Sequence, residues 1–373
     1  MKKVLLVFGT RPEAIKMCPL VLELQRRPTE FEVEVCVTGQ HREMLDAVLE
    51  VFEVKPTYDL SIMKEGQTLF DITTAVLLQI KSVIEESRPD IILVHGDTTT
   101  SFAAALAAFY EQIDIGHVEA GLRTNNLYSP YPEEFNRQAV DVLANYYFAP
   151  TESARDNLLK EGKQDSKIFV TGNTGIDALA TTVKHDFSHP LIDKWLRPND
   201  KLILVTAHRR ENLGSPMHRM FRAIRRIADE FTDVKVLYPV HLNPRVRDVA
   251  NDELSNCDSI KLIDPLDVLD FHNFMARSYI ILTDSGGIQE EAPSLGKPVL
   301  VMRDTTERPE GVAAGTLKLV GTDELTIYEN CRMLLTDKAQ YDAMSKASNP
   351  YGDGKASQRI ADILSNKDGD ERL

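Results

Sequence analysis

The first half of the chain alternates short apolar runs with longer amphipathic stretches. The amphipathic stretches, such as residues 13–27 and 68–86, have the character of helices. The apolar runs between them are strand-like and lie at residues 4–8, 33–38, 91–95, 115–118, 146–149 and 168–170. Uninterrupted apolar strands that alternate with helices are typical of a parallel sheet covered on both faces.

This pattern stops at residues 185–200, which show little periodicity and contain Trp195, the only tryptophan. We interpret them as a domain junction and linker. The pattern resumes with apolar runs at residues 202–205, 234–238, 260–263, 279–283, 298–302 and 317–320, separated by helices that include 288–295 and 324–336. The predicted fold is therefore α/β, with two Rossmann-like domains built on parallel sheets, at residues 1–175 and 176–354. Residues 355–364 read as a last helix, and we expect the segment 355–373 to pack back on the first domain.

Length and charge narrow the classes of function. The chain has 373 residues and a formal net charge of −14, which argues against a nucleic-acid-binding surface because such surfaces need clustered Lys and Arg. Its four cysteines are far apart, as expected for reduced thiols in a cytosolic protein. The first apolar run is too short for a signal peptide, and no run is long enough to span a bilayer. We expect a cytoplasmic protein with no membrane partner.

Ligands of open parallel sheets bind beyond the carboxyl ends of the strands, so the residues that follow each strand are informative. After the first strand, Gly9 permits a tight turn and Pro12 suits a first helical turn, with Arg11 and Lys16 beside it. Positive charge at a helix start is typical of a phosphate site. The alternative is an ordinary capped turn with solvated charges.

Three further loops of the first half carry a carboxylate: Asp97 follows the strand 91–95, Glu119 follows 115–118, and Glu133 comes soon after. Asp97 could instead be a helix N-cap, and Glu133 could be the acidic first turn of a helix. Three carboxylates on one edge of one sheet favour acid–base chemistry over these separate structural roles.

In the second half, His208 follows a strand closely and has basic neighbours. A catalytic or phosphate-binding role and a structural role are equally compatible with this position. The turn Ser285-Gly286-Gly287 also follows a strand and opens a helix, so its N–H groups can approach a pyrophosphate. A carboxylate one turn later can reach ribose hydroxyls, and residues 303–308 supply further cations. A capped turn is the alternative.

Several motifs are absent from the sequence. It has no GxGxxG after a strand and no GxxxxGK[ST], so nicotinamide and P-loop nucleotide sites are not expected. It has no HExxH or paired Cys/His cluster for a catalytic metal, and no GxSxG hydrolase turn. We therefore expect no cofactor and no metal.

Taken together, the motifs resemble those of the bacterial non-hydrolysing UDP-N-acetylglucosamine 2-epimerases, in family order over essentially the whole chain. The matching segments are residues 8–16, 95–99, 116–123, 132–134, 208–211, 238–244, 283–293 and 349–354. The resemblance implies a GT-B-like pair of domains with the site in the interdomain cleft, and a homodimer. It also implies that UDP-N-acetylmannosamine is made for cell-surface polysaccharides.

The resemblance also implies roles for individual residues. The catalytic set would be Asp97, Glu119, Glu133 and His208. The residues that hold UDP would be Arg11, Lys16, Phe271, Ser285, Gly286, Gly287, Glu291 and Arg308. Leu266 stands where the family often has a Gln that contacts uracil.

Many members of this family bind a second UDP-N-acetylglucosamine as an activator. The positions here that match this second site are Gln40, His41, Gln67, Arg209 and His241. Glu43 and Gly66 stand where the family has Gln and Arg, so two side chains that could contact the activator's phosphates are missing.

The chemistry expected of such a site starts from the leaving group, because the sugar C2 proton is not next to a carbonyl. UDP would leave C1, a carboxylate would take the C2 proton, and 2-acetamidoglucal would form. Protonation from the other face and return of UDP would give the epimer. The sequence leaves open which carboxylate is base and which is acid. Three alternatives also remain: a hydrolysing 2-epimerase, a GT-B glycosyltransferase and a catalytically silent sugar-nucleotide sensor.

Overall fold

The computed structural model describes residues 1–39, 42–64, 66–306 and 308–365. The chain divides into two compact units. Unit 1 comprises Met1–Thr181 and Tyr351–Leu373, and unit 2 comprises Thr182–Pro350. The predicted boundaries, after residues 175 and 354, lie a few residues away from these divisions.

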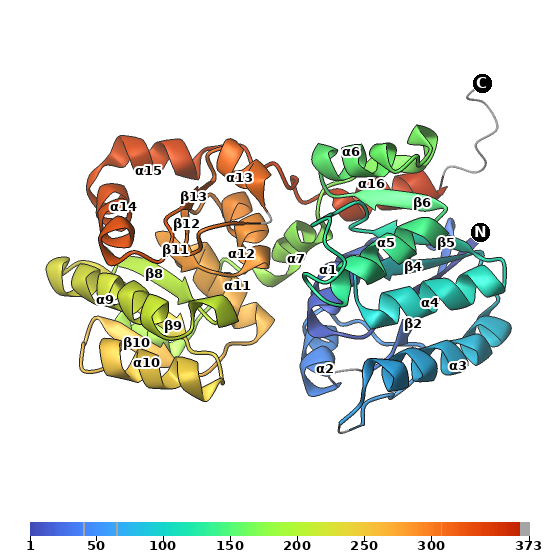
Figure 1. Cartoon of the computed structure of the whole chain (residues 1–373), viewed down its shortest axis with the longest axis horizontal. Coiled ribbons are helices and arrows are strands. Elements are labelled where there is room, and N and C mark those ends of the chain that lie inside the picture. Colours follow the sequence, from blue (N-terminus) through green and yellow to red (C-terminus); the bar gives the residue numbers. More distant parts are fainter. Residues whose placement is uncertain (40–41, 65, 307, 366–373) are drawn as a thin grey trace. The chain divides into compact units, whose positions relative to one another are not determined.

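Unit 1 is built on a seven-stranded parallel sheet in the order β3-β2-β1-β4-β5-β6-β7 (Figure 1). The strands are β1 Lys2–Phe8, β2 Phe31–Val37, β3 Tyr58–Asp59, β4 Ile91–His95, β5 Asp114–Val118, β6 Tyr146–Ala149 and β7 Ile168–Val170. The central strands are buried along most of their length because helices cover both faces. This is the pattern that the uninterrupted apolar runs predicted.

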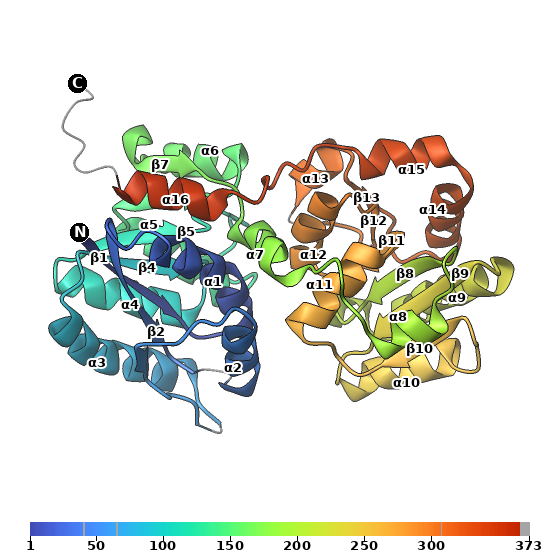
Figure 2. The ribbon, with the colours of Figure 1, turned by 180° about the vertical axis from the view of Figure 1, so that it is seen from behind.

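The helices of unit 1 pack in rows on the two faces of this sheet (Figures 1 and 2). Helices α3, α4 and α5 lie side by side on one face, while α1 contacts both α2 and α16 on the other. The helices are α1 Arg11–Gln25, α2 Arg42–Val51, α3 Leu69–Ser87, α4 Thr99–Tyr110, α5 Glu133–Leu143, α6 Glu152–Lys160, α7 Thr174–Thr182 and α16 Ala356–Ser365.

Unit 2 is built on a six-stranded parallel sheet in the order β10-β9-β8-β11-β12-β13. The strands are β8 Lys201–Thr206, β9 Val234–Pro239, β10 Ile260–Ile263, β11 Ile280–Thr283, β12 Val299–Val301 and β13 Leu317–Leu319. The helices are α8 Pro190–Trp195, α9 Ser215–Glu230, α10 Pro244–Leu254, α11 Val268–Arg277, α12 Gly286–Glu291, α13 Pro309–Ala313, α14 Glu324–Thr336 and α15 Lys338–Ser345. Helix α9 packs between α10 and α14 over one face of the sheet, with Phe221 edge-on to Tyr238 in the core.

Two details differ from the sequence prediction. The edge strand β3 was not predicted, because two residues are too short to show any periodicity. Residues 185–200, predicted as a linker, belong to unit 2 and contain α8, where the indole N–H of Trp195 donates to the Asp258 carbonyl at 3.1 Å. No described helix is both long and apolar enough to cross a membrane.

Helix α16 returns to unit 1. The Asp177 carboxylate on α7 accepts from the backbone N–H groups of Ala356 (3.2 Å) and Ser357 (2.7 Å) at the start of α16. Arg27, just after α1, donates to Asp362 at 2.6 Å. Burial of Ile360 and Leu364 shows that the last helix completes the apolar layer beside α1. The part of the predicted segment beyond residue 365 lies outside the described residues.

Candidate functional site

Three loops meet at one edge of the unit 1 sheet, because β1, β4 and β5 are neighbours and all run parallel. The loop after β1 leads into α1, where Thr10 is the N-cap and forms a reciprocal capping box with Glu13. Gly9 is required here, since a Cβ at this position would lie 1.9 Å from Thr38 Oγ1. Arg11, the first helical residue, is exposed at this edge.

Buried Glu13 ties the first loop to the second. Its carboxylate accepts from the N–H groups of Gly9 (3.1 Å) and Thr10 (2.8 Å). It also accepts from the hydroxyls of Thr98 (2.7 Å) and Ser101 (3.1 Å), which belong to the loop after β4 and to α4. The position of the phosphate-type turn is therefore coupled to that of the neighbouring loop that carries Asp97.

Glu119 directly follows β5 and has a left-handed backbone, with φ of 68°. Non-glycine residues rarely adopt this conformation, and where they do the position is often functional. Its side chain is only 10% exposed and forms an ion pair with the ammonium of Lys16 on α1. His95 Nε2 lies 3.4 Å from the same carboxylate, and Asn173 Nδ2 donates to it at 3.4 Å.

These neighbours determine the charge of Glu119. Burial acts to raise the pKa of its carboxyl, and this is the largest single influence. The attraction to Lys16 and the interactions with His95 together outweigh burial, and the pKa of Glu119 lies well below its usual value. Glu119 is therefore an anion at neutral pH as long as Lys16 stays beside it.

Asp97 is held by a different cation. It is not the N-cap of α4, because that position belongs to Thr98, whose hydroxyl accepts from the Ser101 N–H at 3.0 Å. The Asp97 carboxylate forms an ion pair with Arg137 of α5, and Asn136 Nδ2 donates to the Asp97 carbonyl at 3.0 Å. Helix α5 thus fixes both the backbone and the side chain of Asp97.

Glu133 is the first residue of α5 and is half-buried. Within the described part of the chain, no hydrogen bond or ion pair to its carboxylate is found, in contrast to Asp97 and Glu119. The next residue, Glu134, is fully buried and accepts from the Thr124 and Asn125 N–H groups and from Arg137. Glu134 therefore shapes the loop before α5, while Glu133 is left available to a ligand.

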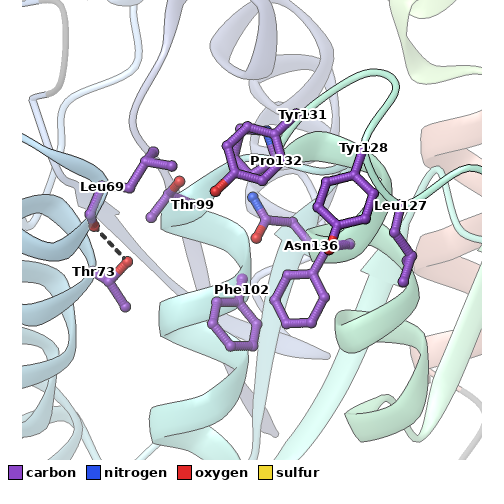
Figure 3. A pocket seen from close by; sticks show the side chains of 10 residues that line it. Leu69, Thr73, Thr99, Phe102, Leu127, Tyr128, Tyr131, Pro132 and Asn136 are labelled. Atoms are coloured by element: carbon purple, nitrogen blue, oxygen red, sulfur yellow. Dashed lines mark hydrogen bonds between the residues drawn. The ribbon is translucent and has the colours of Figure 1, made fainter.

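A cavity of about 380 Å³ lies beside these loops (Figure 3). Phe102 on α4 and the aromatic rings of Tyr128 and Tyr131 border it. Asn136, which also bonds to the Asp97 backbone, and Pro132, which precedes Glu133, line the same space. The cavity therefore borders residues that adjoin both carboxylates, and its walls are mainly apolar.

In unit 2, Asp284 at the end of β11 shapes the loop that carries His208. Its buried carboxylate accepts from the His208 N–H (2.9 Å), the Arg209 N–H (2.9 Å) and Asn212 Nδ2 (3.1 Å). The His208 ring stacks on His241 with centroids 5.4 Å apart. Partial burial lowers the pKa of His208, the Asp284 charge opposes this, and His241 and Arg209 add to the lowering.

The turn Ser285-Gly286-Gly287 opens α12 beside two cations. A Cβ on Gly286 would lie 3.8 Å from Arg209 Nη2 and 3.9 Å from Arg308 Nη2, so both guanidinium groups reach the open side of this glycine. Arg308 is itself held by an ion pair with Glu290. N–H groups at a helix start together with two arginines favour a diphosphate.

Glu291 lies at the end of α12, and its carboxylate is near Gly287, since a Cβ there would be 3.8 Å from Oε1. His272 Nε2 is 3.6 Å from Glu291 Oε2, and the other ring nitrogen bonds to the Thr182 hydroxyl at 2.7 Å. Phe271 precedes this histidine on α11 and is half-buried. Glu291 thus places a carboxylate near this turn, where ribose hydroxyls could reach it, and the Phe271 ring lies beside His272, with centroids 6.4 Å apart.

The comparisons with known proteins decide the family. The model of the family described as UDP-N-acetylglucosamine 2-epimerase matches residues 22–365. The UDP-N-acetylglucosamine 2-epimerase of Bacillus subtilis (strain 168) is 63% identical over 362 residues, covering 97% of this chain and 94% of that one. The chain belongs to the UDP-N-acetylglucosamine 2-epimerase family.

Solved structures agree with this epimerase fold. A UDP-GlcNAc 2-epimerase from Neisseria meningitidis, crystallised bound to UDP-GlcNAc, is similar with a TM-score of 0.88 and 52% identity, covering 97% of this chain and 99% of that one. A glycosyltransferase of kitacinnamycin has a TM-score of 0.66 at 12% identity, over 97% of this chain and 98% of that one, which shows a shared fold alone. The predicted α/β, GT-B-like fold is confirmed.

The positions that match the epimerase family's second ligand site are only partly described. Gln40 and His41 lie outside the described residues. Gln67 uses its amide within its own loop, donating to the Ile62 carbonyl at 2.7 Å and accepting from the Lys64 N–H at 2.9 Å. The other two, Arg209 and His241, lie near His208 in unit 2.

Several residues that contact the candidate site residues were not predicted. Glu13, His95, Arg137 and Asn173 contact the predicted residues or their loops. His117 is fully buried, with Nδ1 2.6 Å from Asp141 and Nε2 2.8 Å from the Gly96 carbonyl, so it braces the Asp97 turn. Glu13, His95 and His117 carried a sequence signal, because each lies within a segment that matches the family, whereas Arg137 and Asn173 lie outside those segments. Among the described residues, no group of three or more His, Cys, Asp or Glu could hold a metal ion.

Proposed function

We propose that this protein interconverts UDP-N-acetylglucosamine and UDP-N-acetylmannosamine by eliminating UDP and adding it back. The observation that carries the proposal is the set of three carboxylates at one sheet edge of unit 1, each in a different electrostatic setting. Asp97 has an arginine, Glu119 a lysine and Glu133 no described counterion. The family membership and the relative bound to UDP-GlcNAc support the choice of substrate.

The elimination balances without a redox partner. The C1–O bond breaks, and its electron pair leaves with the β-phosphate oxygen of UDP. The C2–H bond breaks, its electron pair forms the C1=C2 double bond of 2-acetamidoglucal, and the proton passes to a carboxylate. Addition of a proton at the opposite face of C2 and of UDP at C1 reverses these changes and inverts C2. Acid–base groups of this kind contribute about 10²–10⁴-fold each.

Unit 2 supplies the binding of UDP in this proposal. The N–H groups of the Ser285-Gly286-Gly287 turn and the guanidinium of Arg308 stabilise the diphosphate as its charge grows. Glu291 accepts from the ribose hydroxyls, and Phe271 packs on the uracil side. His208, with a lowered pKa, is neutral at pH 7 and can donate a hydrogen bond to the diphosphate or pass a proton.

Unit 1 supplies the chemistry at the sugar. Arg11 and Lys16 add positive charge for the diphosphate, and Asp97, Glu119 and Glu133 act on the sugar. The left-handed backbone of Glu119 and the helix that fixes Asp97 preorganise two of these carboxylates. Glu133, with no described partner, is the carboxylate most open to exchange its proton.

The test is incubation with UDP-N-acetylglucosamine in D₂O, followed by NMR of the products. Proton exchange on a carboxyl group predicts UDP-N-acetylmannosamine that carries deuterium at C2. Retention of the original hydrogen would contradict elimination even if the epimer formed. Free N-acetylmannosamine with UDP would point to the hydrolysing reaction, and an untouched C2 to a glycosyltransferase or a sensor.

The described residues offer a second UDP-N-acetylglucosamine, bound as an activator, fewer contacts than the family pattern does. The Gln67 amide is already hydrogen-bonded within its own loop, and Gly66 has no side chain. Arg209 and His241 remain near His208. A sigmoidal dependence of rate on substrate, abolished by His241→Ala, would support an activator, whereas hyperbolic kinetics in both directions would oppose it.

We also propose a homodimer that uses the outer face of α3, α4 and α5. These adjacent helices expose large apolar side chains: Phe70 (85%), Leu78 (67%), Phe109 (56%), Tyr110 (64%) and Val142 (72%). Apolar patches of this kind mark interaction sites. Light scattering of the wild type should give twice the mass of one chain, and Val142→Glu should give the mass of one chain. A monomeric wild type would refute the dimer. From the substrate class we further propose that this protein works in the cytoplasm and supplies the synthesis of cell-surface polysaccharide.

A further inference from the structure

If the proposed function holds, the ammonium of Lys16 must interact with both Glu119 and the diphosphate. The proposal gives its ammonium to the diphosphate, yet in the structure this ammonium forms an ion pair with Glu119. The two side chains are 15% and 10% exposed, so little solvent screens their attraction. A diphosphate that recruits Lys16 must therefore compete with Glu119.

Glu119 is the fixed member of this pair. Its left-handed backbone lies between the buried β5 and Ala120, and its carboxylate is also near His95 Nε2 and Asn173 Nδ2, each at 3.4 Å. Lys16 carries its charge on a flexible four-carbon chain. When a second anion arrives, the lysine is the group that can move.

We propose that Lys16 is shared between Glu119 and the departing diphosphate. Cleavage of the C1–O bond then draws Lys16 toward UDP and leaves Glu119 able to hold the C2 proton. While UDP is esterified to the sugar, its β-phosphate lacks the charge that it gains when the C1–O bond breaks. That added negative charge draws Lys16 away from Glu119. Glu119, now buried without its lysine, accepts the proton from C2 as the C1=C2 double bond forms.

The return step uses the same exchange in reverse. In the return to the starting sugar, UDP attacks C1, Glu119 gives its proton back to the same face of C2, and Lys16 goes back to Glu119. In the step that forms the epimer, a second carboxyl group protonates the opposite face of C2, and the proton on Glu119 passes to solvent as the β-phosphate loses charge and Lys16 returns. One lysine thus links the charge on the leaving group to the proton affinity of the base. On this proposal Glu119 carries a proton only while the C1–O bond to UDP is broken.

Asp97 provides a matched comparison, because its cation cannot be shared in this way. Arg137 bonds to Asp97 and, at 2.9 Å, to the buried Glu134, and it lies on α5 rather than on the predicted phosphate turn. Removing the charge of Asp97 therefore changes the net charge of unit 1 equally without releasing Lys16.

The experiment measures UDP binding by isothermal titration calorimetry at pH 7.5 for wild type, Glu119→Gln, Lys16→Met, the double variant and Asp97→Asn. Loss of the competing carboxylate should make Glu119→Gln bind UDP roughly tenfold more tightly, as expected for a freed charge-assisted contact. Lys16→Met should bind UDP roughly tenfold more weakly. The double variant should bind UDP with an affinity within twofold of that of Lys16→Met. Asp97→Asn should bind UDP with an affinity within twofold of that of wild type.

Three results would overturn the inference: unchanged or weaker binding by Glu119→Gln, equal tightening in the Lys16→Met background, or equal tightening by Asp97→Asn. If Lys16→Met alone fails to fold because Glu119 is left buried and unpaired, the double variant compared with Glu119→Gln still isolates the lysine. The inference rests on the proposed function, but UDP affinity is measured without turnover. A wild type that epimerises while Glu119→Gln binds UDP no better would refute only the sharing of Lys16.

Discussion

Arg137 forms an ion pair with Asp97 from the first turns of α5, while the neighbouring Asn136 donates to the Asp97 backbone. One helix therefore sets the position and the charge of a carboxylate on a different loop. Such a carboxylate is preorganised before substrate arrives, which is the arrangement that electrostatic catalysis needs. This pairing leads to the first of four predictions.

Replacing Arg137 with Gln leaves Asp97 and Glu134 without their cation. We expect a loss of about 3 kcal/mol in the free energy of unfolding, as for other buried pairs broken on one side, and a fall in kcat of at least about tenfold. Urea denaturation and initial rates measure the two effects. Arg155→Gln is the control, since its partner Asp165 is largely exposed and such pairs contribute under about 1 kcal/mol. Equal effects of both changes would contradict a special role for Arg137.

Glu119 predicts how stability depends on pH. Its pKa in the folded protein lies well below the usual value, so its ion pair stabilises the protein fully above the unfolded-state pKa of about 4.3. This contribution is lost as the pH falls through the folded-state pKa. The difference in unfolding free energy between wild type and Glu119→Gln should thus be constant from pH 8 to 6 and shrink below pH 4. A difference that grows on acidification would show that the pKa is not lowered.

Arg308→Ala should raise KM for UDP-N-acetylglucosamine by roughly 10- to 100-fold, because a charge-assisted hydrogen bond contributes about 1.5–3 kcal/mol. Steady-state kinetics measure KM directly. Arg332→Ala, which removes an exposed arginine of the same unit paired with Glu230, should leave KM unchanged. An unaltered KM in the Arg308 variant would remove this residue from the UDP site.

His208→Gln should reduce kcat by about 10²–10⁴-fold if the ring transfers a proton or binds the diphosphate. Stability should change little, because Asp284 holds this loop through the backbone N–H groups of His208 and Arg209. His218→Gln on α9, where the ring bonds to Glu253 instead, is the control. Wild-type rates with His208→Gln would leave the ring without a catalytic role.

The meeting of the loops after β1, β4 and β5 at one sheet edge was predictable, because the strands that precede them are parallel. Apolar runs located the strands, and the carboxyl ends of β1, β4 and β5 then had to share one edge. The same reasoning found Asp97, Glu119 and the Ser285-Gly286-Gly287 turn. The positions of these residues follow from where each strand ends, and the pattern of apolar residues along the chain shows where the strands end.

The pairing of side chains was not predictable. Arg137 lies 40 residues from Asp97 and Lys16 lies 103 residues from Glu119, so only the folded chain brings them together. Glu13 reads as half of a local capping box, and nothing in the sequence shows that it also accepts from Thr98 and Ser101. Tertiary partners of this kind decide which carboxylate is charged and which is open.

The packing of α16 on α1 affects the order in which this protein can be made. The ribosome releases most of unit 1 first, then all of unit 2, and only then the helix Ala356–Ser365 that covers α1. Until then, the surface that receives Ile360 and Leu364 is exposed to water. Nascent unit 1 is thus incomplete during most of translation, and a gene cut after residue 181 would encode a domain that lacks its closing helix.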